Sequence, residues 1–174
     1  GNKVIYIPNP PHWVCGVISS TMFMVWVKQF AGRLKSDISI SPGLTYFTFP
    51  FLVPSLTSIA SIEKCVDSIF KIRNAHLGAS LADLYDPLTM PPTLVKAHNE
   101  LDKAVDLAYR PQAFTSEANR MVFLFELYEN YTADLFTKEK PKKYGKISLW
   151  NLSSYENSIV EFAFSQLFFL ISIA

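Results

Sequence analysis

The residues with the most evident chemistry in this sequence are three neighbours in a short basic segment, Arg33, Lys35 and Ser36. Arginine and lysine are the main donors both to phosphate oxygens and to base edges, so a turn of this composition could bind nucleic acid. Two other interpretations remain open. The cations could lie at the solvated end of a helix, where positive charge interacts favourably with the helix dipole. Alternatively, Asp37 could pair with Arg33 or Lys35 and organise the turn.

Other chemistries find little support. No nucleophile stands near a base, no paired carboxylates occur in apolar surroundings, and no phosphate-binding loop is present. The spacing of His12, His76 and His98 does not suggest a metal site, and Cys15 and Cys65 add no ligand pattern. The sequence therefore predicts no catalytic, metal-binding or cofactor-binding residue in this chain.

The composition limits the kind of protein. The 174 residues carry a net charge of only +1, which argues against nucleic-acid binding through overall positive charge. Aromatic residues make up 14% and charged residues 18%, a balance typical of a chain that packs much of its surface against something else. Cys15 and Cys65 are far apart in apolar contexts, which favours two buried thiols over a disulfide and predicts a cytoplasmic protein.

Residues 1–54 are predicted to form a small unit of strands and one helix. Apolar spacing gives the expected order, which is a strand over 4–7, a helix over 21–31, a strand over 37–41 and a strand over 44–49. Because Pro42-Gly43 is a turn dipeptide, the last two strands should form a hairpin. Tyr46, Phe47 and Phe49 could stack on DNA, but alternation places at least one of them in the core, which is the favoured interpretation.

Residues 55–137 are predicted to form a mainly α-helical bundle. The expected elements are a helix of about four turns from Ser58, a short turn over 82–85, a helix between Pro91-Pro92 and Pro111, and a helix capped by Thr115 or Ser116. His98 lies at helical spacing from Leu94 and Leu101, so it should lie in the core or at its edge. Asp102, Lys103 and Asp106 are expected to form a solvated helix face with local ion pairs.

Residues 138–174 differ from the rest in composition. Five lysines among residues 138–146 predict a solvated linker in preference to a contact with the DNA backbone. The apolar segment 159–174 is shorter than the roughly 20 residues that span a bilayer, so no membrane partner is expected. The predicted fold class is α+β, with segments 1–54, 55–137 and 138–174.

Two long motifs carry a resemblance to a known family. The first extends from Gly16 to Pro50 and includes Ala31-Gly-Arg-Leu-Lys-Ser-Asp-Ile-Ser-Ile-Ser41. The second includes Ala79-Ser-Leu-Ala-Asp-Leu-Tyr-Asp-Pro87 and Phe123-Leu-Phe-Glu-Leu-Tyr128. They resemble the end of the target recognition domain and the C-terminal helical domain of the large adenine-specific DNA methyltransferases of the MmeI type, also called type II-L. The resemblance covers roughly residues 4–137.

The resemblance implies a C-terminal piece of a longer bacterial restriction-modification enzyme. The implied reaction is methyl transfer from S-adenosylmethionine to adenine N6 in duplex DNA, with the cofactor held by an upstream methyltransferase domain. Asn9-Pro10-Pro11-His12 resembles the catalytic Asn/Asp-Pro-Pro-aromatic motif of such enzymes. However, histidine replaces the aromatic residue and too few residues precede it for a cofactor-binding strand and turn. We therefore interpret it as a loop of the recognition domain.

The end of the chain departs from the family pattern. The family usually ends in a short basic tail soon after the position of Thr137, whereas an apolar segment over 147–174 follows here. The abrupt change at Tyr144 favours a frameshift over a lineage-specific addition.

The expected function is DNA recognition and structural support for the methyltransferase, without catalysis by this piece itself. The expected DNA contacts are Arg33, Lys35 and Ser36, with Lys28 as an outer phosphate contact. The expected partners are duplex DNA and the upstream methyltransferase and recognition domains. The alternative is a structural or protein-interaction module that makes no DNA contact, and a weaker third interpretation makes the apolar tail a membrane anchor.

Overall fold

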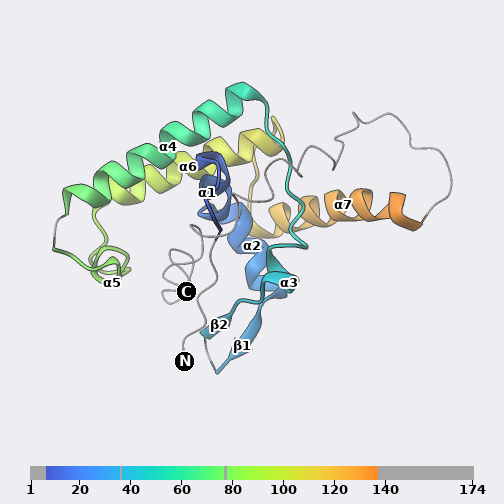
Figure 1. Ribbon diagram of the computed structural model, residues 1–174, viewed down its shortest axis with the longest axis horizontal. Coiled ribbons are helices and arrows are strands. Elements are labelled where there is room, and N and C mark those ends of the chain that lie inside the picture. The colour runs from blue at the N-terminus through green and yellow to red at the C-terminus, as the bar shows by residue number, and fades with distance from the viewer. Residues whose placement is uncertain (1–6, 36, 77, 137–174) are drawn as a thin grey trace.

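The computed structural model describes residues 7–35, 37–76 and 78–136, and within them the fold is α+β, as predicted. The elements, in order, are α1 (His12–Ile18), α2 (Thr21–Phe30), β1 (Gly32–Leu34), β2 (Asp37–Ser39), α3 (Pro42–Thr45), α4 (Leu56–Ala75), α5 (Leu81–Leu84), α6 (Pro92–Tyr109) and α7 (Glu117–Phe136). Helices α4 and α6 lie side by side along one edge, and the β1–β2 hairpin lies on the far side of α1 and α2 from them (Figure 1). The predicted strand over 4–7 and the predictions for 138–174 fall wholly or mostly outside the described residues.

The helical region matches its prediction closely. Pro92 opens α6, and the buried stripe of this helix comprises Leu94, Ala97, Leu101, Val105 and Tyr109. The Ser55 side chain accepts a hydrogen bond from the Ser58 amide and caps α4. The Ser116 hydroxyl oxygen accepts a hydrogen bond from the Asn119 amide, 3.1 Å away, at the start of α7. Local signals therefore located the starts of α6 and α7, whereas α4 begins at Leu56, before the predicted start at Ser58.

The first segment differs from its prediction in two respects. Helix α1 was not predicted, although it buries five consecutive residues, Val14 to Ile18. The predicted hairpin between 37–41 and 44–49 is wrong, because β2 pairs with the strand that precedes it in the sequence, β1. Residues 42–45 instead form the short helix α3, which Pro42 opens and which the Thr45 hydroxyl steadies by donating to the Ser41 carbonyl. The Pro42-Gly43 pair thus begins a helical turn and does not reverse a strand.

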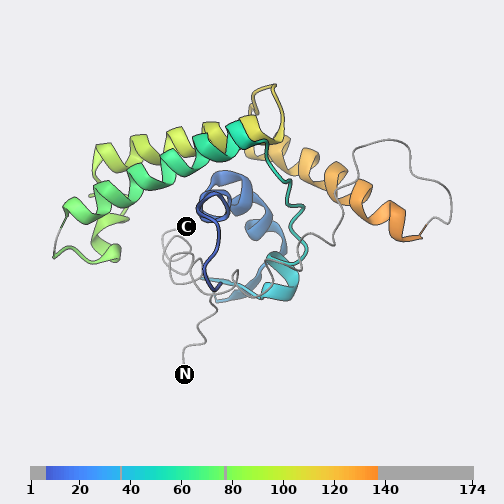
Figure 2. The same ribbon diagram turned by 45° about the horizontal axis from the view of Figure 1, so that its top comes forward.

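The two predicted units share one hydrophobic core. Helix α1 packs against α4 and α6 so closely that a Cβ added at Gly16 would overlap the Ile62 side chain and lie 3.0 Å from Val66 Cγ2. On the other side of the molecule, Trp26 of α2 is 1% exposed, and its ring lies 5.9 Å from that of Phe125 on α7. Figure 2 shows α1 and α2 in the concavity formed by α4, α6 and α7. The division near residue 54 stays a prediction, but residues from both sides of it contribute to the same core.

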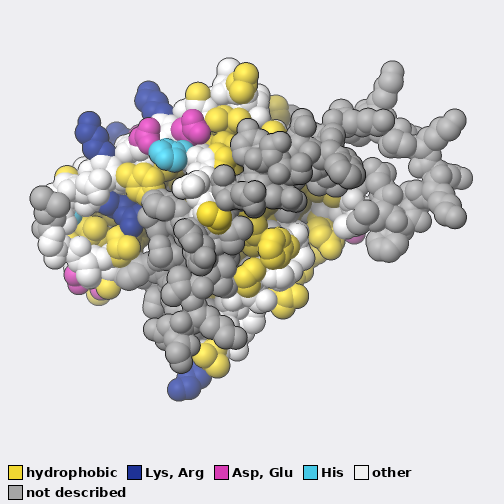
Figure 3. Space-filling view, viewed as in Figure 1, with side chains coloured by type: hydrophobic (Ala, Val, Ile, Leu, Met, Phe, Trp, Pro, Cys, Tyr) yellow, Lys and Arg dark blue, Asp and Glu magenta, His cyan; other side chains and the backbone are white. Residues whose placement is uncertain are grey.

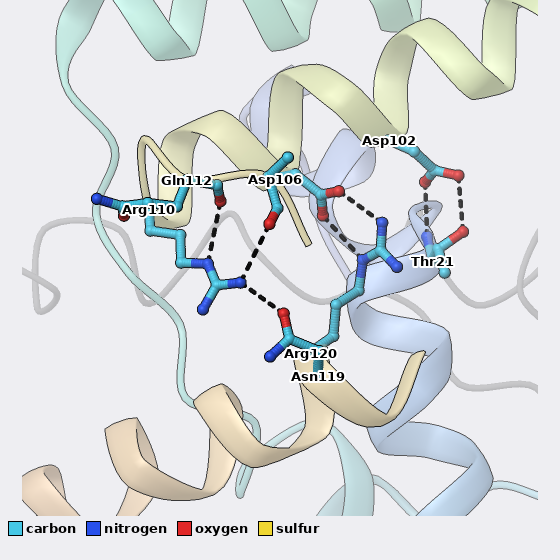
Figure 4. Close-up of polar contacts among 8 residues, drawn as sticks. Thr21, Asp102, Asp106, Arg110, Gln112, Asn119 and Arg120 are labelled. Carbon is cyan, nitrogen blue, oxygen red and sulfur yellow. Dashed lines mark hydrogen bonds and ion pairs between the residues drawn. The ribbon is translucent and has the colours of Figure 1, made fainter. Parts of the chain in front are cut away.

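The predicted solvated face on α6 is wrong for both of its acidic residues (Figure 4). Asp102 accepts hydrogen bonds from the amide (2.7 Å) and the hydroxyl (2.6 Å) of Thr21, so it caps the first turn of α2 from a neighbouring helix. Asp106 accepts two hydrogen bonds from the Arg120 guanidinium, and each of these two side chains is 14% exposed. Sequence spacing could not show this, because the partners come from helices α2 and α7. The two acids connect three helices.

Candidate nucleic-acid interface

The β1–β2 hairpin projects from the helical body and carries the basic turn. Its strands pair antiparallel with the register Gly32–Ser39, Arg33–Ile38 and Leu34–Asp37. Lys35 follows β1 directly, and its φ of 58° lies in the left-handed region. Tight hairpin turns favour positive φ because their twist then matches that of the strands. The sequence thus places Arg33 and Lys35 at the projecting end of a two-stranded ribbon (Figure 1).

The register decides which side chains share a face of the ribbon. Residues directly opposite one another in an antiparallel pair lie on the same face. Ile38 is 9% exposed and belongs to the hydrophobic core, so the Arg33–Ile38 face is the one turned towards the body. The other face carries Gly32, Leu34 and Ser39, all of which are exposed. The hairpin therefore has an inner face anchored by Ile38 and an outer face open to solvent.

Arg33 and Lys35 are both exposed, and the structure brings them together at the hairpin tip. Basic and apolar side chains lie next to one another at this tip (Figure 3). Among the described residues, neither cation has a hydrogen-bond or ion-pair partner. Ser36 and the side chain of Asp37 lie outside the described part, so the pairing of Asp37 with Arg33 or Lys35 stays open. Both described cations are exposed to solvent, where an external anion can reach them.

Lys28 is placed differently. It lies in the last turn of α2, and its ammonium nitrogen is 3.1 Å from Oε1 and 3.3 Å from Oε2 of Glu117, the first residue of α7. This exposed pair joins α2 to α7, and surface pairs of this kind contribute at most about 1 kcal/mol. A phosphate contact by Lys28 would therefore have to compete with Glu117.

The aromatic residues after the hairpin divide between core and surface. Phe49 is 4% exposed and packs edge-on against Phe23 at a ring separation of 5.0 Å, which confirms the core interpretation for this residue. Tyr46 is half-buried, and burial raises the pKa of its hydroxyl. Phe47 is 74% exposed. Of the three, only Phe47 offers a ring face to a partner.

The Asn9-Pro10-Pro11-His12 segment leads into a helix. Pro11 occupies the N-cap position of α1, and Asn9 has a positive φ of 43°. His12 Nδ1 lies 3.5 Å from Asp67 Oδ1 of α4, with both side chains exposed. The segment therefore orients the start of α1 against α4.

A shallow hollow between α1, α4, α5 and α6 contains the other polar group of interest. His98 Nε2 and the Tyr85 hydroxyl are hydrogen-bonded at 2.9 Å, at the edge of the core, as predicted for His98. Burial, together with the nearby Arg73 charge, lowers the pKa of His98 to about 4. A neutral imidazole bonded to a tyrosine holds α5 against α6. Within the described residues, no group of three or more His, Cys, Asp or Glu side chains could hold a metal ion.

The cysteines and the helices bear on two further expectations. Cys15 is buried and Cys65 is half-buried, and both are free thiols, so the preference for thiols over a disulfide is confirmed. Burial raises the pKa of Cys15 to about 11, which keeps it protonated. Within the described residues, no helix combines the length and apolar character needed to cross a membrane.

Comparison with known proteins identifies the segment that carries the hairpin. Residues 1–53 match the family model described as "MmeI, target recognition domain", and residues 57–136 match "MmeI, C-terminal domain". The chain belongs to the MmeI family. The hairpin lies in the part matched to the target recognition domain, and α4 to α7 lie almost entirely in the part matched to the C-terminal domain.

Two similar proteins support this membership in the MmeI family. DNA methyltransferase A of Bacillus subtilis (strain 168) is 40% identical over 131 residues, which are 75% of this chain and 15% of that protein. A solved structure of the Type IIL restriction-modification enzyme MmeI in complex with DNA is 42% identical, with a TM-score of 0.67, and the match covers 70% of this chain and 16% of that one. The chain thus spans about one sixth of the length of each relative.

Proposed function

We propose that this chain is the DNA-recognition and bracing part of a site-specific DNA methyltransferase of the MmeI family, and that its β1–β2 hairpin contacts the duplex. The observation that carries the proposal is a pair of exposed cations, Arg33 and Lys35, at the tip of a projecting ribbon within the segment matched to the target recognition domain. The related MmeI structure is a complex with DNA, which agrees with this role.

The geometry of the hairpin suits duplex DNA. The major groove of B-form DNA admits a two-stranded β-ribbon, and arginine and lysine bind both the phosphates at its rim and the guanine edges inside it. The ribbon is held at its base by Ile38 in the core and follows directly from α2. Helix α2 is held in turn by Asp102 of α6 and Glu117 of α7. The C-terminal helices α6 and α7 therefore fix the position of α2 and, through it, of the β1–β2 hairpin.

For the whole protein we propose methyl transfer from S-adenosylmethionine to adenine N6 in duplex DNA, in the bacterial cytoplasm. The described residues do not fit the cofactor, because their sheet is a two-stranded antiparallel hairpin that lacks a glycine-rich turn leading from a strand into a helix. We therefore assign the cofactor to another part of the protein and derive no catalytic step from this chain.

The experiment is a salt titration of DNA binding with the double variant Arg33→Ala/Lys35→Ala. Each lost phosphate contact lowers the slope of log K against log salt by about 0.9, so two lost contacts should flatten it by up to about 1.8. Affinity at low salt should fall in parallel. Binding is measured by fluorescence anisotropy with a labelled duplex between about 50 and 200 mM salt.

The matched control is Lys64→Ala/Lys71→Ala, which removes the same charge from exposed positions on α4, away from the hairpin. If the control flattens the slope as much as the hairpin variant does, overall charge and not the hairpin is responsible. Unchanged affinity and slope in the hairpin variant would overturn the proposed DNA contact.

The second candidate is a protein-interaction module that makes no DNA contact. It is favoured by the exposed apolar side chains of Leu44 (58%) in α3 and Phe47 (74%) just after it. This candidate requires that Arg33→Ala/Lys35→Ala leave DNA binding by the whole protein unchanged, so the same titration distinguishes the two functions.

A further inference from the structure

We propose that Leu34 is a specificity-determining contact to the 5-methyl group of a thymine in the major groove. This inference rests on the proposed function, because it assigns a target to a side chain of the same hairpin. Leu34 is an apolar residue between two cations, so it carries no charge or hydrogen-bonding group of its own.

The placement of Leu34 is what makes it informative. Single exposed apolar residues are common on protein surfaces and need no explanation by themselves. Leu34, however, is 70% exposed at the tip of a projecting hairpin, on the outer face that the register defines. A partner that binds the tip of the hairpin from this side therefore contacts Leu34.

The outer face carries no side chain at Gly32, next to Leu34 on the same strand. Gly32 lies on the same face two residues earlier, and a Cβ built there would contact only its cross-strand neighbour, at 3.6 Å from the Ser39 carbonyl oxygen and 4.0 Å from Ser39 Cβ. Glycine in a strand often marks a place where another surface approaches the backbone closely. A flat partner can therefore approach this face until it touches the leucine side chain.

The electrostatic surroundings favour DNA over an apolar protein surface. Arg33 and Lys35 flank Leu34 in sequence, and among the described residues no acidic side chain pairs with either cation. Asp37 stands opposite Leu34 in the register, which leaves one positive charge in excess at the tip. Covering this excess positive charge with an apolar surface would cost its hydration without compensation, whereas a polyanion compensates it.

Base chemistry then identifies the group that Leu34 would contact. In the major groove, the edges of unmodified bases present hydrogen-bond donors and acceptors and one apolar group, the C5 methyl of thymine. Leucine can form no hydrogen bond, so its favourable contact in the groove is that methyl. The ligand class is therefore duplex DNA with a thymine at the position that faces the outer side of the ribbon.

The test compares duplexes that differ only in this methyl. Duplexes are first selected from a random library with the unaltered chain, and each selected duplex is then synthesised with thymine or with uracil. The measured quantity is the ratio of the dissociation constant on the uracil duplex to that on the thymine duplex. Burial of one methyl group predicts a ratio of about four for the unaltered chain.

Two variants test whether the ratio depends on Leu34. Leu34→Ala should bind both duplexes equally, so its ratio should fall to about one. The matched control Leu88→Ala removes another exposed leucine (94%) from the loop before α6 and should keep the ratio of the unaltered chain. Because Leu34 makes little contact with the protein, circular dichroism should show an unchanged fold in Leu34→Ala.

The outcomes separate this inference from the proposed function. If Arg33→Ala/Lys35→Ala weakens binding but the unaltered chain shows a ratio of one, the hairpin binds DNA and the Leu34 inference is overturned. If Leu34→Ala loses affinity equally on both duplexes, Leu34 contacts something other than the methyl, and the inference is also overturned. If the unaltered chain selects no duplex, the proposed function fails for this chain, and the role of Leu34 fails with it.

Discussion

Replacement of Gly16 by alanine tests how closely the recognition segment is locked to the C-terminal helices. Gly16 lies in α1, and a Cβ at this position would overlap Ile62 Cγ2, lie 3.0 Å from Val66 Cγ2 and lie 3.2 Å from Leu101 Cδ1. Ile62 and Val66 belong to α4, and Leu101 belongs to α6. The Cγ2 atoms are bonded to the Cβ atoms of β-branched residues, which strongly prefer one χ1 rotamer in a helix, so moving them aside is costly.

The expected magnitude is the difference of two opposing terms. Alanine in place of glycine inside a helix gains about 1 kcal/mol of stability. An extra methyl in a well-packed core costs about 1–3 kcal/mol, and the rigid neighbours here place the cost in the upper half of that range. Gly16→Ala should therefore lower the free energy of unfolding by about 1–2 kcal/mol.

Gly43→Ala is the matched control. A Cβ at Gly43 in α3 would meet no atom within 4 Å, so only the helix-forming gain, at most about 1 kcal/mol, should remain. Urea unfolding measures both variants, followed by circular dichroism for the helices and by tryptophan fluorescence, to which the buried Trp26 contributes. The two transitions should coincide, because both segments share one core.

A second substitution checks the cause of the Gly16 effect. Ile62→Ala removes the atom that the new methyl would overlap, so it should cost less stability in the Gly16→Ala background than in the unaltered chain. If Gly16→Ala is as stable as Gly43→Ala, α1 does not pack against α4 as the structure shows. The bracing role of the C-terminal helices would then be refuted.

Two further predictions concern Asp102, whose predicted solvent exposure was wrong, and His98, whose hydrogen-bond partner the sequence did not identify. Burial raises the pKa of Asp102, so its stability contribution is complete below the ordinary value of 3.8 and falls as pH rises through the folded pKa. Asp102→Asn keeps an acceptor for the Thr21 amide, so its free energy of unfolding in urea at pH 7 should match or exceed that of the unaltered chain. Asp102→Ala loses the cap and should lower the free energy of unfolding by about 1–2 kcal/mol. Equal losses in both variants would contradict this account. Burial lowers the pKa of His98 to about 4, so its contribution is present above the ordinary value of 6.5 and is lost as pH falls through 4. His98→Gln should flatten the fall of the urea midpoint between pH 6.5 and 4, and an unchanged pH profile would exclude His98 as its source.

The sequence by itself determined the elements whose signals are local. The long helices α4, α6 and α7 follow from apolar spacing, and the starts of α6 and α7 follow from Pro92 and Ser116. The motif around Arg33 and Lys35 also located the exposed basic turn. These features depend on neighbours within about one helical turn, so periodicity and capping rules can find them.

Only the tertiary structure decided which residues face which partner. The capping of α2 by Asp102 joins residues 81 positions apart, and the hairpin register depends on where β2 finds a partner strand. The sequence offered Leu44 to Phe49 as that partner, but Pro42 begins a helix and leaves Gly32 to Leu34 as the pairing strand. A shift of partner moves side chains between the two faces of a ribbon. The exposed position of Leu34 and the partly buried positions of Asp102 and Asp106 therefore depend on contacts between distant segments, which no local pattern encodes.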